Sequence, residues 1–74
     1  MMASRLSRFM AARKIRITRL ATASGRHRYF LARLVHGVAQ PTALTIKALV
    51  KGARKVTNDP SIQANDLFPL DDDD

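Results

Sequence analysis

The stretch HRYFLARLVHGVAQPTALTIKALVKGARKV, residues 27–56, decides the fold class of this chain. Its apolar side chains recur at the three- and four-residue spacing of an amphipathic helix, over about 27–39 and again over about 41–56. Gln40-Pro41 separates the two runs, because proline disfavours the α conformation of the residue before it. The pattern therefore predicts two helices, with Pro41 as the first residue of the second.

The segment before this stretch predicts a third amphipathic helix, over about 4–23. Its apolar residues Leu6, Phe9, Met10, Ile17 and Leu20 share one arc of a helical projection, and arginines occupy the adjacent arc. Ser4 suits the N-cap of this helix, and Gly25 suits the left-handed residue that ends it. The sequence thus predicts an all-α fold of two to three short helices, at about 4–23, 27–39 and 41–56, followed by an extended acidic tail.

Charge divides the chain into two parts, a basic helical segment at 1–58 and an acidic extended tail at 59–74. The first part holds all 13 Lys and Arg and no Asp or Glu, and the second holds all six acids, every one Asp. A basic block of this density is typical of proteins that bind a polyanion. The predicted contacts to such a partner are Arg5, Arg8, Arg16, Arg19, Arg26, Arg28, Arg33, Lys47, Lys51, Arg54 and Lys55.

The acidic tail has no sustained helical or strand period. It combines scattered apolar residues with a terminal run of aspartates, so it is predicted to be an extended segment that docks by its apolar side chains. The predicted anchors on a neighbouring protein are Leu67, Phe68, Leu70, Asp71, Asp72, Asp73 and Asp74.

Several kinds of chemistry have no support in the sequence. There is no Cys, and His27 and His36 project from opposite sides of any helix that they share, so neither a metal site nor a cofactor is expected. No carboxylate precedes Asp59 to orient a catalytic histidine, so we expect no enzyme and no small-molecule substrate. The longest uncharged run, residues 34–46, is shorter than the ~20 residues of a membrane span, so no transmembrane helix is expected.

Nucleic-acid binding is supported by charge density alone. Zinc-finger spacing, the aromatic RNA-recognition signature and leucine-zipper heptads are absent from the sequence. Contacts to nucleic acid are therefore expected to address the phosphate backbone and to be largely independent of sequence. The triplet Arg26-His27-Arg28, at the turn between the first two predicted helices, is the best local candidate.

Two interpretations fit these observations. Because Met1 to Ser24 is Arg-rich, amphipathic and free of acids, as mitochondrial targeting segments are, we prefer a mitochondrial accessory subunit of a respiratory-chain or ribosomal assembly. Its partners would be other protein subunits, RNA or anionic lipid headgroups. The alternative is a free-standing bacterial or viral protein, of the cytoplasm or the virion, that binds RNA, DNA or an acidic protein face non-specifically. In that case the acidic tail would be autoinhibitory.

Overall fold

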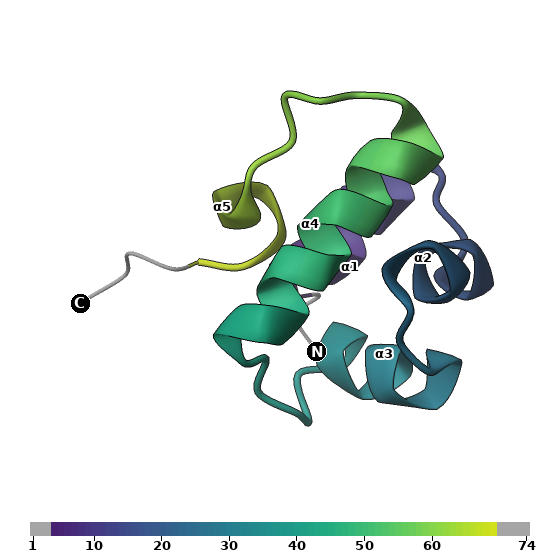
Figure 1. The fold of residues 1–74 in the computed structure, drawn as a ribbon. Helices are drawn as coiled ribbons and strands as arrows, with labels where there is room; N and C mark the ends of the chain where they lie inside the picture. Colours follow the sequence, from purple (N-terminus) through teal and green to yellow (C-terminus); the bar gives the residue numbers. More distant parts are fainter. Residues whose placement is uncertain (1–3, 70–74) are drawn as a thin grey trace.

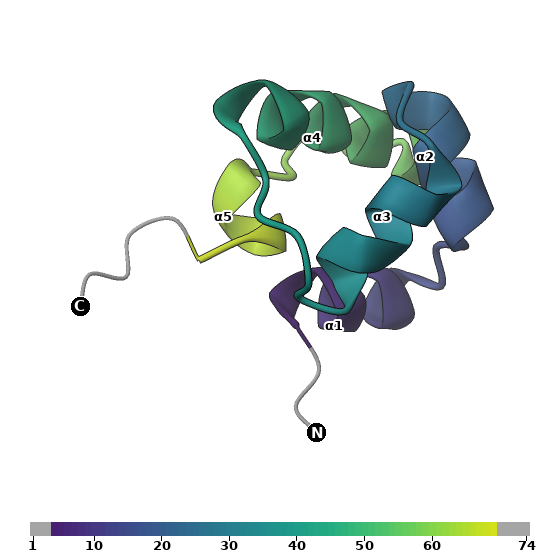
Figure 2. The ribbon, with the colours of Figure 1, turned by 90° about the horizontal axis from the view of Figure 1, so that it is seen from below.

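The computed structural model describes residues 4–69, which form α-helices and no strand (Figure 1). The helices are α1 (Arg5–Arg13), α2 (Ile17–Ser24), α3 (Arg28–Val35), α4 (Ala43–Thr57) and α5 (Ala64–Leu67). The prediction of an all-α fold is confirmed. α4 is the longest helix; α2 and α3 lie to one side of it and α5 to the other, as Figures 1 and 2 show.

The hydrophobic core draws on every helix and on the link between α4 and α5. Its fully buried large side chains are Leu6, Leu20, Leu31, Leu49, Ile62 and Leu67. α2 packs mainly on α4, while α5 contacts both α1 and α4. A single short helix cannot bury its own apolar face. The core therefore forms only when all of the helices pack against one another.

The range predicted as one helix, 4–23, is two helices in the structure. Ser4 caps α1 as predicted, since its hydroxyl oxygen accepts the Ser7 N–H at 3.0 Å, but Lys14 takes the left-handed conformation (φ 56°) and ends the helix. Ile15 lies nine residues after Leu6, so a continuous helix of about 100° per residue would place the two side chains on opposite sides. The break buries both side chains in one core.

The other two helices are shorter than predicted. α3 ends at Val35 instead of residue 39, and Gly37 (φ 76°) then turns the chain into the loop that precedes α4. α4 begins at Ala43 instead of Pro41, because Thr42 is the N-cap and its Oγ1 accepts the N–H of Thr45 at 3.2 Å. The capping hydrogen bond, rather than the fixed φ of proline, sets the start of this helix.

Part of the segment predicted as an extended tail folds onto the helical body. Leu67 and Phe68 are buried in the core, with α5 as the element that positions them. Arg54 fixes the link to α5, since its Nε donates to the carbonyl oxygen of Ile62 at 2.8 Å. Residues 59–69 therefore belong to the packed domain, whereas residues 70–74 lie outside the described residues.

The carboxylate of Asp59 joins this segment to α1. The Ser61 hydroxyl, which donates to it at 2.6 Å, and then the Arg13 guanidinium, at 2.8 Å, lower the pKa of Asp59 from 3.8 to about 2. The unfolded chain titrates near the ordinary value, so the ionised carboxylate stabilises the fold above about pH 4, and this contribution is lost as the pH falls towards 2.

We therefore expect the melting temperature to fall between about pH 4 and pH 2, in part through Asp59. An NMR titration of the Asp59 carboxyl carbon measures its pKa directly. The variant Asp59→Asn should lack this part of the pH dependence. A carboxyl that titrates at the ordinary Asp value would contradict the hydrogen bonds described here.

Candidate functional site

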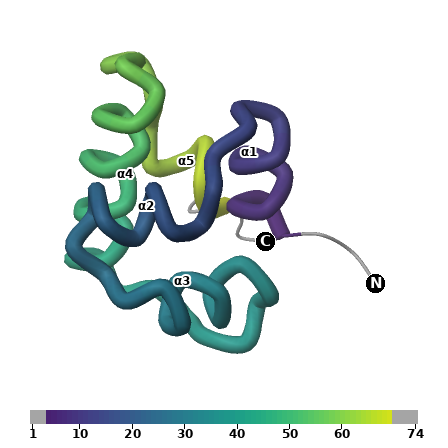
Figure 3. Tube along the Cα trace, turned by 90° about the vertical axis from the view of Figure 1, so that its right-hand side faces the viewer, coloured from purple at the N-terminus to yellow at the C-terminus, as the bar shows by residue number. Residues whose placement is uncertain are grey.

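A short connection joins α2 and α3 (Figure 3). Three residues, Gly25 to His27, join the two helices. Gly25 takes the predicted left-handed conformation (φ 73°), and the N–H of Arg26 donates to the carbonyl oxygen of Ala21 at 3.0 Å. On the other side of the turn, His27 Nδ1 accepts the N–H of Tyr29 at 3.2 Å and caps α3. Hydrogen bonds on both sides thus fix the angle between α2 and α3.

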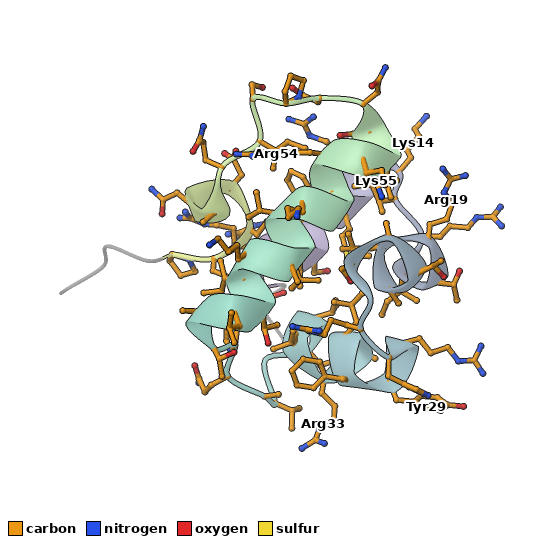
Figure 4. All side chains as sticks on the ribbon, viewed as in Figure 1. Lys14, Arg19, Tyr29, Arg33, Arg54 and Lys55 are labelled. Atoms are coloured by element: carbon orange, nitrogen blue, oxygen red, sulfur yellow. The ribbon has the colours of Figure 1, made fainter. Side chains whose placement is uncertain are left out.

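α3 presents a polar face outward and an apolar face to the core. Leu31 and Leu34 are buried beneath it, against the rest of the domain. The residues on the opposite side fall within an arc of roughly 140° at about 100° per residue. We call this the outer face of α3, and it consists of Arg28, Tyr29, Ala32, Arg33 and the C-cap residue His36. Figure 4 shows Tyr29 and Arg33 pointing away from the body of the molecule.

Aromatic and cationic groups interact at the start of the outer face. The guanidinium carbon of Arg28 lies 5.1 Å from the centroid of the Tyr29 ring, and its Nη2 donates to the Tyr29 hydroxyl at 3.3 Å. The imidazole of His27 contacts the same ring, with centroids 5.1 Å apart. Tyr29 nevertheless remains 64% exposed, so this cluster stands on the surface and does not belong to the core.

Two contacts hold α2 and α3 against the remainder of the fold. Gly52 in α4 faces Ser24, the last residue of α2, so closely that a Cβ at position 52 would lie 2.9 Å from the Ser24 backbone nitrogen. At the far end of α3, the Ser4 hydroxyl donates to the carbonyl oxygen of Val35 at 2.7 Å. These contacts hold the pair α2 and α3 in place at the end of α2 and at the end of α3, and so fix the position of the outer face of α3.

The predicted anion-binding residues do not form a single patch. Arg26 and Arg28 line one surface depression at the turn. Arg33 lies one turn further along α3, while Arg16 and Arg19 lie at the start of α2. Lys55 and Arg19 line the same pocket, and Figure 4 shows both in its upper part, whereas Arg33 lies at the bottom. The remainder are on other sides: Lys47, Lys51 and Arg54 line one groove on α4, and Arg5 and Arg8 lie beside α5.

Some of these cations have a structural contact. Arg5 Nη1 donates to the carbonyl oxygen of Asn65 at 2.8 Å, as Arg54 does to Ile62, so both hold the C-terminal segment in place. The predicted tail anchors Leu67 and Phe68 are buried in this chain's own core. The other predicted anchors, Leu70 and Asp71 to Asp74, lie outside the described residues.

The acids of the described residues are remote in sequence from the turn and α3. They are Asp59, which pairs with Arg13, and Asp66, whose Oδ2 accepts the N–H of Gln63 at the start of α5. Along α2, the turn and α3 there is no carboxylate to offset the arginines. The charged side chains of this unit are therefore all cationic, which favours contact with a polyanion.

Tyr29 and His36 were not among the residues predicted for the site. They were missed because only lysines and arginines were selected as contacts. The interpretation of residues 4–23 as one helix also hid α2 as a short helix of its own. A sequence signal was present: Ala21 is small enough for close packing, Gly25 follows it by four residues, and Leu31 lies six further on. Two short helices joined by a three- or four-residue turn with Gly is a motif with that signature.

The described residues offer no metal site and no membrane-spanning helix. Residues 4–69 contain no group of three His, Cys, Asp or Glu side chains that could hold a metal ion. Within the same range, every helix is too short or too polar to cross a membrane.

Comparison with protein families identifies the unit. The model of the Cro/C1-type HTH (helix-turn-helix) DNA-binding domain matches residues 5–53, which include α1, α2, α3 and most of α4. No curated protein and no solved structure gives a significant match. The matched family is a DNA-binding domain and not an enzyme family.

This match corrects the preferred interpretation from the sequence. It supports the alternative, a basic helical protein that binds nucleic acid, over a mitochondrial accessory subunit. The composition that resembled a targeting segment has a structural reason, since residues 5–24 are α1 and α2 of the domain. Their apolar residues build its core, and their arginines lie on its surface.

Proposed function

Because the chain belongs to the family of Cro/C1-type HTH DNA-binding domains, we propose that it binds double-stranded DNA with α3 in the major groove. The observation that carries the proposal is the outer face of α3. Its charged and aromatic side chains are exposed, it has no acids, and Leu31 and Leu34 on the opposite side of the helix hold it on the core. In this motif the second helix reads base edges, and the first helix crosses the phosphate backbone.

The dimensions of the unit suit this partner. The major groove of B-DNA is about 12 Å wide and accepts an α-helix. α3 has eight residues, so at a rise of about 1.5 Å per residue it is roughly 12 Å long. A helix of that length spans a few base pairs, and its N-terminal residues then contact base edges.

The remaining cations fit contacts to phosphate. Arg16 and Arg19 stand at the start of α2, the helix that crosses the backbone in this motif, and both are exposed. Cations that neutralise phosphates release counterions, so the affinity should fall steeply as salt concentration rises. Direct base contacts from α3 would add sequence preference to this non-specific attraction.

Reversing one charge on α3 tests the proposal. We expect the wild-type chain to bind random-sequence duplex DNA at low salt, and Arg33→Glu to weaken that binding by at least about tenfold, because it places a carboxylate against the phosphate-lined groove. The matched control is Arg8→Glu, which makes the same charge change at an exposed position on α1, beside α5. Fluorescence anisotropy across a salt series measures both variants.

The control decides how a loss of binding is interpreted. Far-UV circular dichroism first establishes that each variant keeps the helical content of the wild type. If Arg8→Glu then loses as much affinity as Arg33→Glu, net charge and not α3 determines binding, and the proposed docking is wrong. A wild-type chain that binds no duplex at low salt would refute DNA binding itself.

A further inference from the structure

Two long hydrogen-bond donors dominate the outer face of α3. Arg28 stands in its first turn and Arg33 in its second, while Ala32 between them has no polar group. In the major groove, guanine presents two acceptors, O6 and N7, which match the forked donors of an arginine. Arginine makes this paired contact with a planar group whose geometry is fixed, which lysine does not provide.

The side chain of Arg28 is ordered before any DNA binds. Its guanidinium lies over the Tyr29 ring and donates to the Tyr29 hydroxyl at 3.3 Å, and His27 contacts that ring as well. This stacking restricts the rotamers of a side chain that otherwise loses considerable entropy on binding. A donor that is ordered before binding costs less to order on the DNA.

Arg33 is free to reach outward. Its side chain is exposed, and it makes no ion pair or hydrogen bond to the part of the chain that the structure describes. Figure 4 shows it directed away from the domain. An arginine that serves no packing or pairing role in the fold has its donors available for a ligand.

The spacing of the two arginines sets the spacing of the bases that they can reach. Five residues at about 1.5 Å each separate their Cα atoms by roughly 7.5 Å along the axis of α3. Successive base pairs are about 3.4 Å apart along one strand. The two guanidinium groups therefore address base pairs that are about two to three steps apart, given the reach of the side chains.

We infer that this domain recognises a DNA site with two G·C pairs separated by two to three steps, one read by Arg28 and the other by Arg33 through guanine O6 and N7. Tyr29 acts as a positioning residue for Arg28. The inference rests on the proposed function, which requires only that α3 enters the major groove. It adds the identity of the bases and the residues that read them.

Selection of binding sites from a random duplex pool tests the inference. The wild-type chain should enrich a motif with two required G·C pairs at that spacing. Arg28→Ala should lose the preference at one pair, and Arg33→Ala should lose it at the other, with the rest of the motif unchanged. Arg33→Lys is the matched control, because it keeps the charge but not the fork; since an ammonium can still donate to guanine O6 or N7, it should keep part of the preference that Arg33→Ala loses.

Replacing one guanine at a time by 7-deazaguanine removes the N7 acceptor and keeps the base pair. Each replacement should weaken wild-type binding by about 5-fold to 100-fold, and it should have no effect on the variant that lacks the arginine reading that base. A motif without the two guanines, no enriched motif, or variants that weaken without changing the motif would overturn the inference while duplex binding stands. Failure of the wild-type chain to bind any duplex would instead refute the proposed function.

Discussion

Replacing Gly52 by valine is expected to lower the free energy of unfolding by about 3 kcal/mol or more. An added Cβ would lie 2.9 Å from the backbone nitrogen of Ser24 and 3.0 Å from its Cα. Backbone atoms cannot rotate away as a flexible side chain can, so α2 must move off α4. Because Ser24 directly precedes the turn to α3, this movement also displaces the outer face of α3.

Thermal and denaturant unfolding measure this effect. For a domain of this size, a loss of about 3 kcal/mol lowers the melting temperature by roughly 12 °C or more. Local helix propensity predicts the opposite sign, since glycine is slightly less favourable than valine inside a helix. Lys51→Val is the matched control, because it introduces the same residue at the adjacent, exposed position of α4. If Gly52→Val proved as stable as the wild type, the close packing of α2 on α4 would be wrong.

Leu31→Ala is the second change for which we expect a large effect. The side chain of Leu31, on the core side of α3, is 0% exposed. Shortening it to alanine removes buried apolar surface and leaves a cavity, which lowers the free energy of unfolding by about 2–5 kcal/mol. Domains of this length have little stability to spare, since their surface is large relative to the volume that they bury. We therefore expect a substantial unfolded fraction at ambient temperature.

The same substitution at a surface position provides the comparison. Leu44 in α4 is 73% exposed, and Leu44→Ala should change stability by no more than about 0.5 kcal/mol. Urea unfolding of both variants distinguishes burial from any general effect of losing a leucine. Equal stability of the two variants would show that α3 does not pack on the core as described.

The sequence predicted the elements whose causes are local. Ser4 and Gly25 were identified as helix boundaries, because a capping hydroxyl and a left-handed glycine act on the residues beside them. Segregation of charge was equally plain, and it indicated an anionic partner. The break at Lys14 was not predicted, because no glycine or proline marks it and both flanking segments continue the helical period.

The candidate site was predicted only in part. Arg26 and Arg28 were selected at a turn, and the structure places Arg26 in the turn between α2 and α3 and Arg28 at the first position of α3. Tyr29 was not selected, because nothing in the helical period showed that the side of α3 away from the core would carry an arginine stacked on a tyrosine. Leu67 and Phe68 were assigned to a neighbouring protein, and the structure places them in the core of this chain.

By itself, the sequence determined that this protein is helical, basic up to Asn58 and acidic after it, because helix period, capping and charge depend on neighbouring residues alone. Only the tertiary structure decided where the first helix breaks, which face of α3 stays exposed and that residues 59–69 complete the core. The physical reason is that the burial of one side chain depends on side chains from other elements. A short apolar stripe becomes core or surface according to what packs on it, and those partners are distant in the chain.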